Sequence, residues 1–182
     1  MASNQTRWVK NLYGASGPLI VPGRFAAGST QAIKRGELLE FTGSGNTLWV
    51  PMDSDFDMSA ALGSGGGVAI AACEIKAGDL AGYYPIICPR DGDVFEFALD
   101  ASDDLALGTA LYWTTDSETV TDTAGTNILG NVAGWPHFSA IYPQGHASDA
   151  ASIDKGTTVG TQARVHMTIQ RTNSLFASLQ SH

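Results

Sequence analysis

The sequence predicts an all-β fold: a single compact β-barrel or β-sandwich-like domain with an extended N-terminal arm and at most one or two short helices. Three observations support this prediction. Short segments alternate apolar and polar residues, as half-buried strands do. Turn-forming residues, including many of the 21 glycines, separate these segments. Runs with helical periodicity and caps are scarce. At 182 residues, the chain is long enough for one domain with a sizeable core.

The first 25 residues differ in composition from the rest of the chain. They combine polar residues, aromatic residues and Pro or Gly breaks, which is typical of an extended arm docked on something larger. Gly14, Gly17 and Pro18 interrupt the apolar core that a signal peptide needs, so we expect no secretion signal. The expected organisation is an arm at 1–25, a β domain at 26–171 and a C-terminal tail at 172–182.

The expected strands are short segments rich in aromatic and β-branched residues. In the clearest of them, Val165, Met167 and Ile169 alternate with polar residues, so this strand turns one face inward. A segment at 54–63 is long enough for two helical turns between a polar cap and a glycine. The strands are expected at 37–42, 47–50, 83–88, 94–99, 109–114, 128–132, 138–142 and 163–170.

A glycine-centred phrase occurs three times, as IKRGELLEF, IKAGDLAGYY and LALGTALYW, with Gly36, Gly78 and Gly108 at its centre. Glycine supplies a backbone conformation that branched residues resist, and the residue after it begins a strand. The phrase is therefore a strand entry. The spacing between copies is uneven, which argues against a solenoid of fixed period.

Composition excludes several classes of protein. The formal charge is -8, from 10 Lys and Arg against 18 Asp and Glu, and this sign repels phosphate backbones, so nucleic acid is not an expected partner. The longest nearly apolar run, residues 68–75, is far shorter than a membrane helix needs, so no membrane partner is expected. Cys73 and Cys88 are expected to be reduced, partly buried thiols.

Motifs for catalysis and metal binding are missing. Asp53, Asp55 and Asp57 lie in an acidic segment, but the glycine and the glutamate of a calcium loop are absent at the required positions. The four histidines show no zinc-ligand spacing, and no nucleophile elbow or phosphate loop is present. We therefore expect a protein that is not an enzyme and that uses no metal and no cofactor.

The middle of the chain, about residues 28–135, resembles the small all-β proteins that decorate the heads of tailed bacteriophages. The resemblance rests on the succession IKRGELLEFTGSGNTLWVPM, IKAGDLAGYYPIICPRDGDVFEFAL, DLALGTALYWTTDSETVT and ILGNVAG. These segments follow the same order of elements: a glycine turn, a strand, a Thr-rich hairpin and a Gly-containing strand. The resemblance lies in the order and composition of these segments and does not cover either end of the chain.

The resemblance implies binding without turnover. It implies a viral structural protein, made in the host cytoplasm and located on the outer capsid surface of the virion, that stabilises an icosahedral capsid by clamping adjacent major capsid subunits. The implied partners are the major capsid protein and further copies of the chain, most often as a trimer. The arm is the expected contact with the shell or a neighbouring subunit, through Trp8, Tyr13, Leu19, Ile20, Val21 and Phe25.

Two other classes of function stay open. The first is a virion spike that binds a carbohydrate or a host receptor through an exposed aromatic platform of Trp135, His137, Phe138 and Tyr142, since aromatic residues are enriched at binding hot spots. The second is a small hydrolase, which would need the acidic segment at 53–57 to converge with a histidine in the fold.

Overall fold

The computed structural model describes residues 6–25, 32–42, 48–52, 67–77, 82–99, 107–114, 119–124, 128–134 and 163–169. Within these residues every regular element is a strand, which confirms the all-β prediction. The expected helix at 54–63, the expected strand at 138–142 and the tail at 172–182 lie outside the described residues. The strands are β1 (Arg7–Asn11), β2 (Leu19–Phe25), β3 (Leu38–Thr42), β4 (Leu48–Pro51), β5 (Val68–Ala71), β6 (Gly82–Cys88), β7 (Asp93–Leu99), β8 (Ala110–Thr114), β9 (Thr119–Thr121), β10 (Ile128–Gly134) and β11 (Ala163–Ile169).

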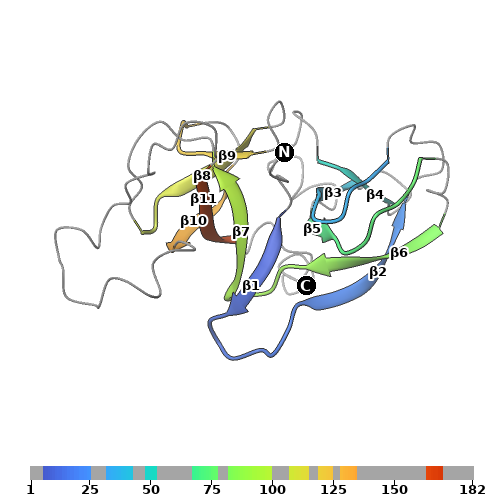
Figure 1. Ribbon diagram of the computed structural model, residues 1–182, viewed down its shortest axis with the longest axis horizontal. Coiled ribbons are helices and arrows are strands. Elements are labelled where there is room, and N and C mark those ends of the chain that lie inside the picture. Colours follow the sequence, from blue (N-terminus) through green and yellow to red (C-terminus); the bar gives the residue numbers. More distant parts are fainter. Residues whose placement is uncertain are drawn as a thin grey trace.

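The strands form two groups that lie side by side (Figure 1). The first is a closed barrel in the order β2-β4-β3-β5-β6, and the second is a six-stranded sheet in the order β1-β7-β11-β10-β8-β9. In the sheet, β9 also pairs with β7, so strands β7 to β11 close on themselves as well. Closure removes most of the free strand edges that would otherwise template aggregation.

The two groups repeat one pairing plan. We call residues 19–88, with β2 to β6, the first unit, and residues 93–169, with β7 to β11, the second unit. In the first unit Phe25 pairs in parallel with Trp49 and antiparallel with Gly82. In the second unit Leu99 pairs in parallel with Val120 and antiparallel with Ala163. Each strand of one unit thus has a counterpart with the same neighbours in the other.

The recurring glycine phrase marks the same point in both units. Gly36 precedes β3 and Gly108 precedes β8, and each has a φ of 84°, a left-handed conformation that glycine adopts without strain. This confirms the expected strand entry at two of the three copies. The third copy, at Gly78, lies outside the described residues.

Residues 6–25, which we expected to extend as an arm, lie within both strand groups instead. β1 pairs antiparallel with β7, and β2 pairs antiparallel with β6 along its whole length. Since β6 leads directly into β7, these pairs form one ribbon that crosses from one unit to the other (Figure 1). The physical reason is burial of apolar surface, because Trp8 packs against one core cluster and Phe25 belongs to the other.

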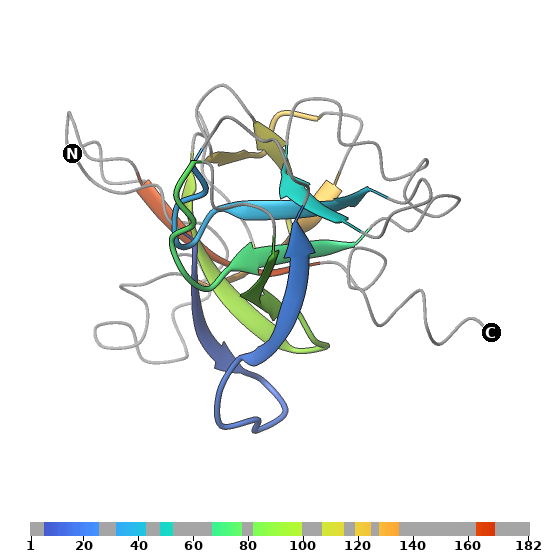
Figure 2. The same ribbon diagram turned by 90° about the vertical axis from the view of Figure 1, so that its right-hand side faces the viewer.

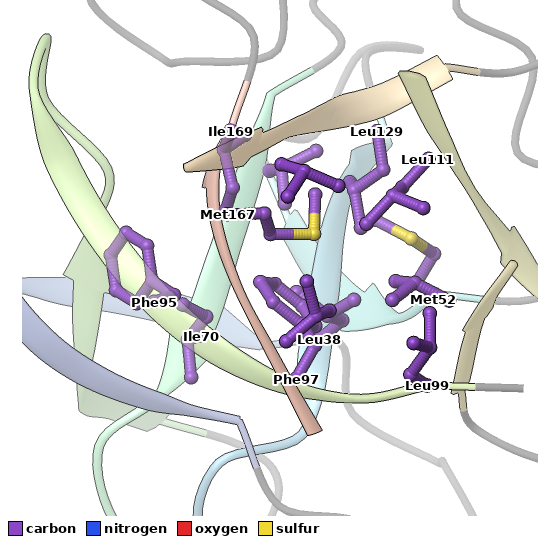
Figure 3. Close-up of a cluster of buried hydrophobic side chains, with 14 residues drawn as sticks. Leu38, Met52, Ile70, Phe95, Phe97, Leu99, Leu111, Leu129, Met167 and Ile169 are labelled. Atoms are coloured by element: carbon purple, nitrogen blue, oxygen red, sulfur yellow. The ribbon is translucent and has the colours of Figure 1, made fainter. Parts of the chain in front are cut away.

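Two apolar clusters make up the core. The smaller cluster fills the first barrel and includes Phe25, Leu39 and Trp49. The larger one spans both units, since Leu38 and Ile70 of the first unit pack among the apolar residues of the second (Figure 3). The two units are therefore joined by a shared core as well as by the ribbon.

Candidate functional site

Four of the predicted contact residues face the interior. The indole N–H of Trp8 donates to Oδ1 of Asp93 at 3.1 Å, and its ring packs against the larger core cluster. Phe25 is buried, while Leu19 and Val21 are half-buried against the smaller cluster. These side chains contribute to the two core clusters, and Trp8, Leu19 and Val21 are half-buried.

The other two predicted contact residues, Tyr13 and Ile20, are exposed. The exposed fraction is 80% for Tyr13, in the turn between β1 and β2, and 53% for Ile20 on β2. Leu12, next to Tyr13, is 54% exposed and was not predicted as a contact. In Figure 2 this turn projects from the lower end of the body.

Hydrogen bonds hold the exposed turn in one conformation. Oδ1 of Asn11 accepts from the amide of Tyr13 at 2.8 Å, and the amide of Leu12 donates to the carbonyl of Gly92 at 2.8 Å. The Tyr13 ring lies against Gly92, where a Cβ atom would be only 2.6 Å from the ring. Leu12 and Tyr13 are therefore presented on a preorganised support, which lowers the entropy lost on binding.

A second exposed surface continues from Ile20 across β2 and β6. We define the β2–β6 face as the exposed side chains of Ile20, Pro22, Arg24, Tyr83 and Pro85. Pro22 lies directly opposite Pro85, and Arg24 lies opposite Tyr83, so all five point to the same side of this strand pair. Tyr83 is 71% exposed. Arg24 forms no ion pair with any residue that the structure describes.

The corresponding face of the second unit is buried. There β1 pairs along β7, and the counterparts of Ile20, Pro22 and Arg24 on β7 are all buried. In the first unit, no strand among the described residues pairs along β2 from Leu19 to Arg24 on the side opposite β6. The equivalent positions are thus buried in the second unit and exposed in the first.

A charged cluster lies on the buried face of β7 that carries Glu96. Glu96 of β7 is buried, with Arg7 of β1 and His166 of β11 directly opposite it. Oε2 of Glu96 accepts from Nη2 of Arg7 at 2.8 Å and lies 3.4 Å from Nε2 of His166, and Oε1 accepts from Nε of Arg164. Burial alone would raise the pKa of Glu96, but Arg7 and Arg164 outweigh it and lower that pKa.

A second buried carboxylate, Asp93, links β1 and the β6–β7 connection through hydrogen bonds. It accepts hydrogen bonds from Trp8, from Nδ2 of Asn11 at 2.9 Å, and from the backbone amide of Arg90 at 2.9 Å and its Nε at 3.1 Å. Arg90 also donates to the carbonyl of Gly17 in the β1–β2 connection. Burial alone would raise the pKa of Asp93, but these hydrogen bonds lower it overall. The role of Asp93 is structural, because its acceptor sites are already occupied.

Other candidate chemistry is limited in the described part of the chain. No group of three or more His, Cys, Asp or Glu side chains there is arranged to hold a metal ion. Cys73 is half-buried and Cys88 is buried, and both are free thiols. Among these residues no helix is long and apolar enough to span a membrane.

The residues that sequence reasoning missed carried a readable signal. In 82–88, Tyr83 and Pro85 alternate with Ile86 and Cys88, which is the pattern of a strand with one face buried. Glu96 is the single carboxylate within the otherwise apolar stretch 94–99. Arg24 carried no such signal, because its exposure depends on the pairing of β2 with β6.

The aromatic platform of Trp135, His137, Phe138 and Tyr142 and the acidic residues Asp53, Asp55 and Asp57 lie outside the described residues. Comparisons of the chain with known protein families, with curated proteins and with solved structures found no match.

Proposed function

We propose that this chain is a viral structural protein that decorates the outside of an icosahedral phage capsid and stabilises it by clamping adjacent major capsid subunits. In this proposal it acts by binding and performs no reaction. Its partners are the major capsid protein and copies of itself, most often in a trimer. The supports are the resemblance of residues 28–135 to head decoration proteins and the distribution of exposed apolar side chains.

The observation that carries the proposal is the clustering of those side chains. Among the described residues the large exposed hydrophobic residues are Leu12, Tyr13, Ile20, Tyr83 and Leu107. All except Leu107 belong to the β1–β2 turn or the β2–β6 face. Exposed apolar residues that lie on neighbouring elements are typical of protein interfaces.

The chemistry of the two surfaces suits a protein partner. Tyr and Arg are enriched at interface hot spots, where a rigid aromatic body and a planar guanidinium provide contact area and directed hydrogen bonds. Pro22 and Pro85 stiffen the β2–β6 face, and Pro22 lacks the N–H that an added strand would use. Pro22 therefore disfavours the addition of a partner strand to the edge of β2, which would also promote aggregation. Binding through side chains is favoured instead.

Repetition on a lattice strengthens modest contacts. A protein that contacts two neighbouring subunits, or that is linked to its own copies, binds the second site at a high effective concentration. A net charge of -8 also helps decorated particles to repel one another and stay dispersed.

Surface substitutions test the proposal better than truncation does. Deleting residues 1–25 would remove β1 and β2 and so would test folding. The informative variant combines Ile20→Ser and Tyr83→Ser, and its matched control is Leu107→Ser, which removes an exposed apolar residue elsewhere in the described chain. We expect the double variant to lose about 10-fold or more in occupancy of shells of the encoding phage purified without this protein. The control should bind as the natural protein does.

The results of this experiment distinguish a wrong function from a wrongly assigned contact surface. If the natural protein does not bind such shells, the proposed function is wrong. If it binds, but the double variant binds equally well with an unchanged unfolding midpoint, the contact surface has been misassigned while the function stands.

A further inference from the structure

A β-bulge in β1 places two cations on one side of the second unit. Arg7 lies opposite Glu96 and Trp8 lies opposite Phe95, but the next pair joins Lys10 to Val94, so Val9 is an extra residue. Without the bulge, simple alternation would put Lys10 on the side of Trp8. The bulge turns Lys10 to the side of Arg7, and bulges commonly re-aim side chains in this way.

This side of the second unit carries a surplus of positive charge. Arg7 and Lys10 supply two cations, and Glu96, which also pairs with Arg164, is the carboxylate that lies beside Arg7 in the described part of the chain. The surplus stands out in a chain with a formal charge of -8. His166 lies in the same group, 15% exposed at its side chain and close enough to Lys10 for a direct electrostatic effect.

Two of the cations are open to solvent. The side chain of Arg7 is 69% exposed and uses only Nη2 on Glu96, which leaves the rest of its guanidinium donors facing outward. Lys10 is exposed and forms no ion pair with any described residue. Glu96 meanwhile fixes the guanidinium of Arg7, so that side chain is oriented before any ligand arrives.

We propose that Arg7, Lys10 and His166 form a binding site for an oxyanion, a phosphate or carboxylate group, on the outward side of β1, β7 and β11. Arg7 offers planar donors that match such oxygens, and Lys10 offers a point charge. His166 adds a donor when it is protonated. The site does not depend on the proposed capsid function, because it lies on the second unit and involves none of the β2–β6 face.

The proposal links anion binding to the protonation of His166. Burial lowers the pKa of His166, the positive charges of Lys10 and Arg7 lower it further, and Glu96 opposes them. On β11, Arg164 is the charged residue on the same face as His166, and Thr168, the next residue on that face, does not titrate. Gly134 of β10, which lies opposite His166 on its other side, does not titrate either. An oxyanion at Arg7 and Lys10 offsets the repulsion, so it raises the pKa of His166. By linkage, the anion binds more tightly as the pH falls.

Proton NMR of the histidine rings tests this directly. The probes are inorganic phosphate and citrate, each titrated into the full chain at constant ionic strength made up with sodium chloride. We expect a saturable shift of the His166 signals and a rise in its pKa by about half a unit, as a neighbouring anion in a partly solvated site produces. Which probe saturates at the lower concentration decides between phosphate and carboxylate.

A matched pair of lysine variants completes the test. Lys10→Gln should weaken binding by about 5-fold or more, because it removes one of the two open charges. Lys76→Gln, at another exposed lysine in the described chain, should leave the affinity unchanged. The proposal is overturned if the His166 titration is the same in phosphate, citrate and chloride, or if Lys76→Gln weakens binding as much as Lys10→Gln.

Discussion

Gly36 and Gly108 occupy the same position in the two units and make the same hydrogen bond. The amide of Gly36 donates to the carbonyl of Ala71 in β5 at 2.8 Å, and the amide of Gly108 donates to the carbonyl of Val132 in β10 at 2.8 Å. In both cases the chain reverses before the next strand in a left-handed conformation. A turn with the same glycine φ and the same hydrogen bond therefore precedes the β3–β4 hairpin in one unit and the β8–β9 hairpin in the other.

The first prediction concerns this turn. Gly108→Ala should lower the free energy of unfolding by about 1–2 kcal/mol, because a Cβ atom is strained at a φ of 84° although no atom lies within 4 Å of it. Gly17→Ala is the control, since Gly17 also has open space but no left-handed backbone. Urea unfolding of the two variants measures the difference, and equal stabilities would remove backbone strain as the explanation.

The second prediction concerns two tightly packed glycines. At Gly130 a Cβ atom would lie 2.0 Å from the backbone carbonyl oxygen of Thr168, which cannot move without breaking the β10–β11 pairing. At Gly23 it would meet side-chain atoms of Ile86 and Trp49, at 2.8 and 2.9 Å, and side chains can shift. We expect Gly23→Ala to cost about 1–3 kcal/mol and Gly130→Ala to cost more than about 4 kcal/mol, or to prevent folding. Circular dichroism and urea titrations would show a reversed order if this packing argument fails.

The third prediction is a loss of stability in acid. The folded-state pKa values of Glu96 and Asp93 lie below their ordinary values of 4.5 and 3.8. Their contributions are therefore complete above those ordinary values and are lost as the pH falls through the folded-state values. Glu96→Gln should cost about 1–3 kcal/mol near neutral pH and flatten the acid dependence of unfolding.

The control for the acid experiment is Glu74→Gln, at an exposed carboxylate. It should keep the stability and the acid dependence of the natural protein. An acid profile that is the same for all three proteins would show that the Glu96 cluster does not link protonation to folding.

The fourth prediction separates the two thiols. Burial raises the pKa of Cys88 to about 11, so almost no reactive thiolate is present at mildly alkaline pH. With Cys73→Ser, the remaining Cys88 should react with a thiol reagent about 100-fold more slowly in the folded protein than in denaturant. With Cys88→Ala, the half-buried Cys73 should react much faster than Cys88 does. Equal rates for the two folded variants would contradict the burial of Cys88.

The alternation of residue types identified the stretch 94–99, which forms β7, although both faces of β7 are buried. The expected inward residues Val165, Met167 and Ile169 of β11 are buried as well. β5 escaped prediction because its sequence, VAIA, is entirely apolar and shows no alternation: Ala69 lines the first barrel, and Val68 packs toward the second unit. A strand buried on both sides cannot be told from a short buried helix by periodicity alone.

The repeated unit escaped prediction because unlike residues fill equivalent places. Strand registers place Gly23 and Trp49 in the first unit where Phe97 and Val120 stand in the second. The larger residue of the two stands on β4 in the first unit and on β7 in the second, so the residue types at equivalent places are not kept. Sequence similarity is lost under such exchanges even when the strand pairing is retained.

The candidate binding surface was only partly predictable. Tyr13 and Ile20 were expected from the composition of the first 25 residues, and both are exposed. Tyr83 joins them only because β6 pairs with β2 from nearly sixty residues away along the chain. Contacts of that separation depend on the fold, and no local pattern encodes them.

The route of the chain between the units determines how the protein would respond to a protease. A nick between Cys88 and Asp93 would produce two fragments, yet the N-terminal one would still hold β1 in register with β7 of the other. The Arg7–Glu96 ion pair and the bond from Trp8 to Asp93 would both span the break. Cleaved molecules would thus migrate as one species until denatured, and the halves, made separately, would be candidates for reassembly in trans.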